Sequence, residues 1–114
     1  MPEEIFGNTS GLKPSILKHL ERIYYRKIPP QSIITPEVAR EIAQISAEIN
    51  RQIGLLINRK GKITHVIVGT HHQITIPELK GYRDNIAKLK GLRFIHTYLV
   101  QEFTKSKKLF TNLN

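Results

Sequence analysis

The stretch QIGLLINRKGKITHVIVGTHHQITI, residues 52–76, decides the fold that the sequence predicts. Its apolar residues are mostly isoleucine, leucine and valine, which suit the pleated, half-buried surface of a β-sheet. We expect three short strands, over residues 53–57, 63–68 and 73–76, and Pro77 ends the last of them. The sequence therefore predicts an apolar meander at the centre of the domain.

A charged turn joins the first two of these strands. Asn58-Arg59-Lys60-Gly61-Lys62 places three cations in five residues, and Gly61 stands where a hairpin loop needs a positive φ. A cationic tip of this kind either contacts an anionic partner or keeps a sheet edge soluble.

Two helices are predicted ahead of the sheet. The first covers about residues 13–26, because apolar residues recur there at helical spacing and Pro14 suits a first turn. The second begins after Thr35, a good N-cap, has Pro36 at its first position and ends near Asn50.

Further elements complete the expected domain. They are a lead-in strand at residues 5–6, a short helix over 83–90 and another strand over 92–100. The predicted class is α/β in the α+β sense, with a small mixed sheet of about four or five strands. We expect the domain to cover residues 1–100, and residues 101–114 to form a divergent basic tail whose order the sequence leaves open.

Length and composition limit the class of protein. The chain has 114 residues, of which 39% are hydrophobic, enough for one small domain with a buried core. It has no cysteine, so it forms neither disulfides nor thiolate metal sites, which fits a reducing cytoplasm. The sequence contains no signal-peptide pattern, and no apolar run approaches the ~18 residues of a membrane span. We therefore expect a cytoplasmic protein.

The positive charge is unevenly distributed along the chain. The formal net charge is +9, yet residues 1–58 carry seven cations and six acids, whereas residues 59–114 carry eleven cations and three acids. A basic half favours an anionic partner, and nucleic acid is the commonest one. A solvated cationic surface is the alternative.

Patterns typical of enzymes are missing from the sequence. Gly61 and Lys62 are followed by Ile63, and Gly54 lies too far upstream, so the glycine spacing of a phosphate-binding loop is not present. No serine stands in a glycine elbow. His71 and His72 are neighbours, and neighbouring side chains on a strand point to opposite faces. We therefore expect no catalytic residue.

Four segments, read in order, carry a family resemblance. They are IFGNTSGLKPS (5–15), LERIYYRKIPP (20–30), ITPEVAREIAQISAEINRQIGLLINRKGKITHVIVGTHHQITIPEL (34–79) and LRFIHTYL (92–99). In this order they resemble the N-terminal region of HflX-type GTPases, in the longer form found in many bacteria. The resemblance covers about residues 5–99.

The resemblance implies a role linked to translation. HflX-type proteins bind the large ribosomal subunit and use GTP to act on stalled or stress-damaged ribosomes. GTP and magnesium belong to a later domain of the family, so the resemblance implies a fragment, truncated paralogue or isolated domain that binds rRNA without GTPase activity. The rRNA contacts that we expect are Arg59, Lys60 and Lys62, with Lys88, Lys90 and Arg93 as secondary contacts.

A second resemblance concerns a metal site. The helix and strands, with a His-x-His pattern ending an apolar strand, are similar to the JAMM and RadC-type scaffold, where two histidines and an aspartate hold zinc beside a glutamate base. The corresponding residues here are His96, Tyr98 and Glu48, with lysines where the aspartate would stand. Tyrosine and lysine do not replace imidazole and carboxylate around Zn²⁺. We therefore expect a degenerate remnant with no bound metal and no cofactor.

Two alternative functions remain beside rRNA binding. A metal-dependent hydrolase on a JAMM-like fold requires stoichiometric zinc that depends on His96. An inactive fragment would instead form a homodimer through an exposed strand edge.

Overall fold

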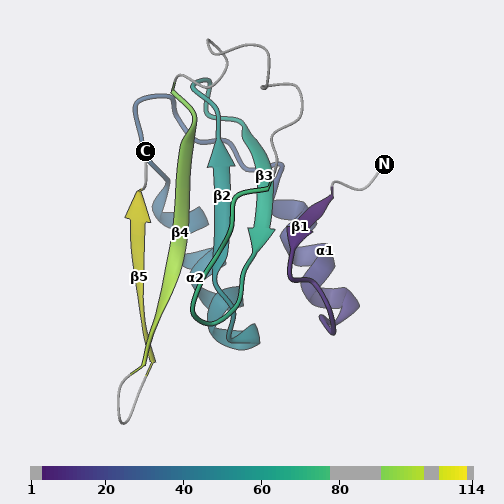
Figure 1. The fold of residues 1–114 in the computed structure, drawn as a ribbon. Helices are drawn as coiled ribbons and strands as arrows, with labels where there is room; N and C mark the ends of the chain where they lie inside the picture. Colours follow the sequence, from purple (N-terminus) through teal and green to yellow (C-terminus); the bar gives the residue numbers. More distant parts are fainter. Residues whose placement is uncertain (1–3, 78–90, 102–105, 113–114) are drawn as a thin grey trace.

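The structure, a computed structural model, describes residues 4–77, 91–101 and 106–112 (Figure 1). The five strands form one mixed sheet in the order β1-β3-β2-β4-β5. β1 is parallel to β3, and all other neighbours are antiparallel. The expected α+β class with a mixed sheet is therefore confirmed. In chain order the elements are β1 (Ile5–Gly7), α1 (Pro14–Ile23), α2 (Pro36–Ile49), β2 (Ile53–Ile57), β3 (Ile63–Val68), β4 (Arg93–Gln101) and β5 (Ser106–Asn112).

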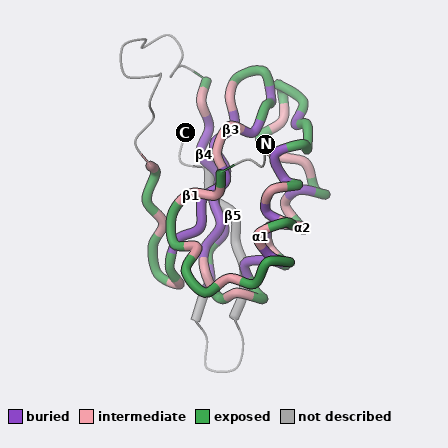
Figure 2. Tube along the Cα trace, turned by 90° about the vertical axis from the view of Figure 1, so that its right-hand side faces the viewer, coloured by how far each residue is buried: buried purple, intermediate pink, exposed green. Residues whose placement is uncertain are grey.

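Both helices cover the same face of the sheet (Figures 1 and 2). The main hydrophobic core lies in this interface, where Leu20 of α1, Ile42 of α2 and Leu55 of β2 are completely buried. The apolar stripes of the two helices face this interface because a helix buries the side of its surface on which apolar residues recur.

A smaller apolar cluster covers the opposite face. It consists of Leu56, Ile67 and Phe94, with Ile74 packed against them. Because β2 lies between two strands and is covered on both faces, all five of its residues are buried. This position accounts for the continuous apolar sequence IGLLI, which would not suit a strand with one solvated face.

The helix termini follow their local signals. Thr35 Oγ1 accepts a hydrogen bond from the Val38 amide at 3.3 Å, and α2 ends at Asn50, whose φ of 58° lies in the left-handed region. The helix α1 is shorter than predicted, because the amides of Tyr24 and Arg26 bond to carbonyls three residues back. These bonds make a tighter turn between Ile23 and Arg26.

The expected third strand of the meander is wrong, since residues 73–76 form no strand. Thr70 turns the chain instead: its hydroxyl accepts from the amides of His72 and Gln73, and its own amide donates to the Gln73 carbonyl at 2.7 Å. The chain then crosses the open face in Figure 1, and Ile74 and Phe94 together fill the space that Gly54 leaves by lacking a side chain. This segment therefore packs onto a face of the sheet through Ile74 and does not pair with a strand at the edge.

The second neighbour of β2 is β4, which confirms the strand predicted over residues 92–100. The basic tail also contributes to the sheet, because β5 pairs with β4 from Gln101↔Ser106 to Ile95↔Asn112. The sheet therefore has β1 and β5 as its outer strands. The helix predicted over 83–90 lies outside the described residues. None of the described helices is long and apolar enough to cross a membrane.

A chain of buried hydroxyl groups ties α2 to the sheet. The Ser46 hydroxyl donates to the Arg51 carbonyl at 2.6 Å and lies 2.9 Å from Thr97 Oγ1. Thr97 Oγ1 in turn accepts from the Ile53 amide at 3.0 Å. Ser46 and Thr97 are both fully buried. Their bonds satisfy polar groups that would otherwise be costly to remove from water.

We predict that Thr97→Val destabilises the fold by about 1–3 kcal/mol, because it leaves the buried Ile53 amide without an acceptor. Thr97→Ser retains the hydroxyl and is the matched control, with a smaller loss from the missing methyl group. Urea unfolding followed by circular dichroism measures both. Equal losses for the two variants would contradict the role of the hydroxyl.

Candidate nucleic-acid interface

The β2–β3 turn is held in one shape by Asn58. Its side-chain Oδ1 accepts hydrogen bonds from the amides of Lys60 and Lys62, each at 2.9 Å. Its backbone carbonyl accepts from the Gly61 amide, also at 2.9 Å. Asn58 therefore holds the turn together through its side-chain and backbone oxygens, and the side chains of Arg59, Lys60 and Lys62 remain exposed.

Gly61 brings this turn into contact with the segment that follows α1. Its φ is +88°, and a Cβ at this position would lie 1.7 Å from the Ile28 carbonyl oxygen. The Ile28 amide donates to the Gly61 carbonyl at 3.2 Å, and Lys27 and Lys62 form an isolated antiparallel bridge. Glycine is therefore required here both by the backbone conformation and by the close approach of a second segment.

A hollow of about 390 Å³ lies where these two segments meet. Among the described residues it is lined by four cations and by no acid. The lining residues are Tyr24, Tyr25, Arg26, Lys27, Lys60, Gly61 and Lys62. Cations from two separate segments thus meet around one concave surface, where they raise the local positive potential.

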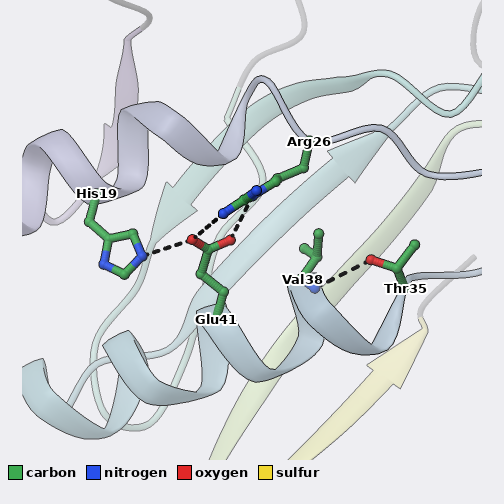
Figure 3. A network of polar contacts seen from close by, with 5 residues as sticks. All are labelled: His19, Arg26, Thr35, Val38 and Glu41. Carbon is green, nitrogen blue, oxygen red and sulfur yellow. Dashed lines mark hydrogen bonds and ion pairs between the residues drawn. The ribbon is translucent and has the colours of Figure 1, made fainter.

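Arg26 is partly neutralised by Glu41 of α2 (Figure 3). Its guanidinium donates two hydrogen bonds to the Glu41 carboxylate, at 3.1 and 3.0 Å, and His19 Nε2 lies 2.8 Å from the same carboxylate. Burial by itself raises the pKa of Glu41, but the hydrogen bonds and charges of Arg26 and His19 outweigh it and hold that pKa below its usual range. The network joins the end of α1 to α2.

The lysines of the hollow have no such compensation. Within the part of the chain that the structure describes, the ion pairs are those of Glu41 with His19 and Arg26. Lys27, Lys60 and Lys62 are exposed and pair with no described acid. Their charges are therefore available to an external anion, together with that of Arg59.

The other predicted rRNA contacts are placed differently. Arg93 is only 8% exposed; its guanidinium donates to the carbonyls of Ser32 and Asn58. It is therefore a structural support beneath the turn, and we remove it from the predicted contact surface. Lys88 and Lys90 lie outside the described residues.

The three residues of the predicted metal remnant do not come together. Thr97 contacts Ser46 of α2, so the side chain of His96, its neighbour on β4, points to the opposite face of the sheet. His96 stacks on Phe94 and meets the Tyr98 ring edge-on at a centroid distance of 4.9 Å. Glu48 instead lies at the end of α2, beside a separate hollow on the helix side.

Metal-ligating side chains do not cluster elsewhere in the described segments. No three histidine, aspartate or glutamate side chains within residues 4–77, 91–101 and 106–112 lie close enough to hold an ion. The His71 and His72 rings contact each other edge-on at 4.7 Å, but no third ligand joins them among these residues.

Sequence reasoning missed Tyr25 and Lys27 as members of the basic surface. They are more than 30 positions before the turn, and the bridge that unites them with it is a tertiary contact. The available signal was the run Tyr24-Tyr25-Arg26-Lys27, which mixes aromatic and basic residues as nucleic-acid surfaces do.

Comparisons of this chain with protein-family models, curated proteins and solved structures gave no match. The predicted membership of the HflX family and the JAMM or RadC-type scaffold therefore stay predictions.

We predict that Gly61→Ala destabilises the protein by more than about 2 kcal/mol, because the new methyl group collides with the Ile28 backbone at a strained φ. Gly11→Ala is the matched control, since Gly11 also has a positive φ, of +77°, but its added Cβ would meet its nearest neighbour only at 3.9 Å. Gly11→Ala should lower the free energy of unfolding by about 1 kcal/mol. Urea unfolding distinguishes the two, and similar losses would contradict the contact.

Glu41 gives the stability a defined dependence on pH. Its pKa in the folded chain is below its ordinary value of 4.5. The interactions of the Glu41 carboxylate with Arg26 and His19 therefore stabilise the folded chain in full above pH 4.5. This stabilisation is lost as the pH falls through the lowered pKa. We predict that Glu41→Gln costs about 1 kcal/mol at pH 7. Urea unfolding of both proteins should show this difference shrinking below about pH 4.5; a constant difference would contradict the prediction.

Proposed function

We propose that this chain is an RNA-binding module that contacts the phosphate backbone through its basic β2–β3 turn. The observation that carries the proposal is the hollow lined by Lys27, Lys60 and Lys62, which pair with no described acid, and by Arg26, which Glu41 partly neutralises. Lysine and arginine side chains neutralise phosphates and release their counterions, which supplies most of the affinity for a nucleic acid of any sequence. We assign the contacts to Arg59, Lys60, Lys62 and Lys27.

The resemblance of the chain to HflX-type N-terminal regions suggests rRNA of the large ribosomal subunit as the RNA. A module of this kind would work in the cytoplasm, where ribosomes act. The proposal gives the chain no catalytic residue and no cofactor of its own, and it leaves GTP hydrolysis to a separate domain. The metal-dependent hydrolase is not proposed, because Glu48 and His96 lie on opposite sides of the sheet.

The salt dependence of RNA binding tests this surface. We predict that replacing Arg59, Lys60 and Lys62 together by alanine lowers the slope of log Kd against log salt by about two units, because each phosphate contact with a single strand contributes about 0.7. Fluorescence anisotropy with a labelled rRNA fragment, between 50 and 200 mM KCl, measures the slope.

A second triple variant controls for the loss of charge. Lys13, Lys18 and Arg40 are exposed cations in the helices or at the start of α1, and none of them lines the hollow. Their replacement by alanine changes the net charge by the same amount and should leave most of the slope intact. If both triple variants lose the same slope, binding follows net charge and the proposed surface is wrong.

A further inference from the structure

Tyr25 is the most exposed large apolar residue that the structure describes. It is 70% exposed, and it lines the basic hollow together with Lys27, Lys60 and Lys62. Its neighbour Tyr24 also lines the hollow, but that ring is buried and its hydroxyl accepts from the Val66 amide at 2.9 Å. Tyr24 therefore belongs to the core, whereas Tyr25 remains exposed at the hollow.

We propose that this hollow receives one unpaired nucleotide of a single-stranded RNA segment, with its base stacked on the Tyr25 ring and its flanking phosphates held by Lys27, Lys60 and Lys62. The inference rests on the proposed RNA-binding function and names the form of RNA that is bound. Aromatic side chains within a positively charged surface are the combination by which proteins bind single strands, because every base has a flat face.

The distribution of the cations favours a strand over a free nucleotide. A nucleotide within a strand has a phosphate on each side, whereas a free monophosphate has one. The lysines come from two segments, with Lys27 across the bridge from Lys62 and Lys60 further along the turn. The volume of about 390 Å³ is within the range of sites that hold small organic groups. A paired base remains stacked inside its duplex and does not reach the Tyr25 ring.

The contact between Gly61 and Ile28 holds Tyr25 and the lysines of the hollow near one another in the free protein. It fixes the turn against the segment after α1 before any ligand arrives, so the backbones that carry Tyr25 and the lysines need no reordering on binding. A site of this kind gains affinity because less conformational freedom is lost on association.

The test compares a ten-nucleotide single-stranded RNA that contains 2-aminopurine with the same sequence in a duplex. Anisotropy of a terminal fluorophore gives the Kd, and quenching of the 2-aminopurine fluorescence reports stacking. Tyr25→Ala should weaken binding of the single strand about 5- to 10-fold and abolish the quenching. Its binding of the duplex and its salt slope should stay unchanged.

Two variants and a melting curve serve as controls. Tyr25→Phe retains the ring and should bind the single strand within twofold of the original chain. Tyr98→Ala removes another exposed tyrosine, on β4 and outside the hollow, and should have no effect on RNA binding. Because Tyr25 is exposed, its truncation should leave the thermal midpoint unchanged, so a folding defect would be recognised directly.

The outcomes separate this inference from the function on which it rests. If the original chain binds neither RNA at 100 mM KCl, both the proposed function and this inference are wrong. If it binds both RNAs and Tyr25→Ala changes neither affinity, the stacking site alone is wrong. If AMP displaces the single strand at a concentration near the Kd of the strand, the hollow belongs to a free nucleotide and the strand assignment is overturned.

Discussion

The close approach of Gly61 to the Ile28 backbone is the constraint on which the candidate site depends. It is possible only because Gly61 has no side chain and adopts a positive φ, and it lets the Ile28 amide donate to the Gly61 carbonyl. Without this contact the lysines of the turn and the cations after α1 would form separate, weakly charged surfaces. Together they line one hollow, where their charges add to the same local potential.

The helix-covered face of the sheet holds the framework that supports the basic surface. The helix face supplies most of the core and the buried hydroxyl chain through Ser46 and Thr97, which holds α2 in place. Glu41 extends this framework to the end of α1 by accepting from Arg26 and His19. The basic surface therefore rests on packed and hydrogen-bonded elements, which is the arrangement that keeps a binding site in one geometry.

Capping residues and turn glycines predicted correctly those features of the fold that depend only on residues close together in the sequence. Thr35 and Pro36 marked the start of α2, Asn50 its end, and Gly61 the turn, because capping and positive φ are decided by neighbouring groups. The strand predicted at 73–76 failed for the opposite reason. Its alternating residues suited a strand, but Ile74 packs onto the sheet beside Gly54, and β1 occupies the position next to β3 that a third meander strand would have taken.

The sequence by itself determined the α+β class, both helices, the β2–β3 hairpin and the cationic character of its tip. The tertiary structure alone decided which cations share a surface: it buried Arg93 beneath the turn and brought Lys27 and Tyr25 to it. It also separated Glu48 from His96, which the resemblance to the JAMM and RadC-type scaffold had grouped as a metal remnant. The reason is physical: a helical turn or a hairpin depends on near neighbours, whereas a site depends on contacts between segments that only the packed core brings together.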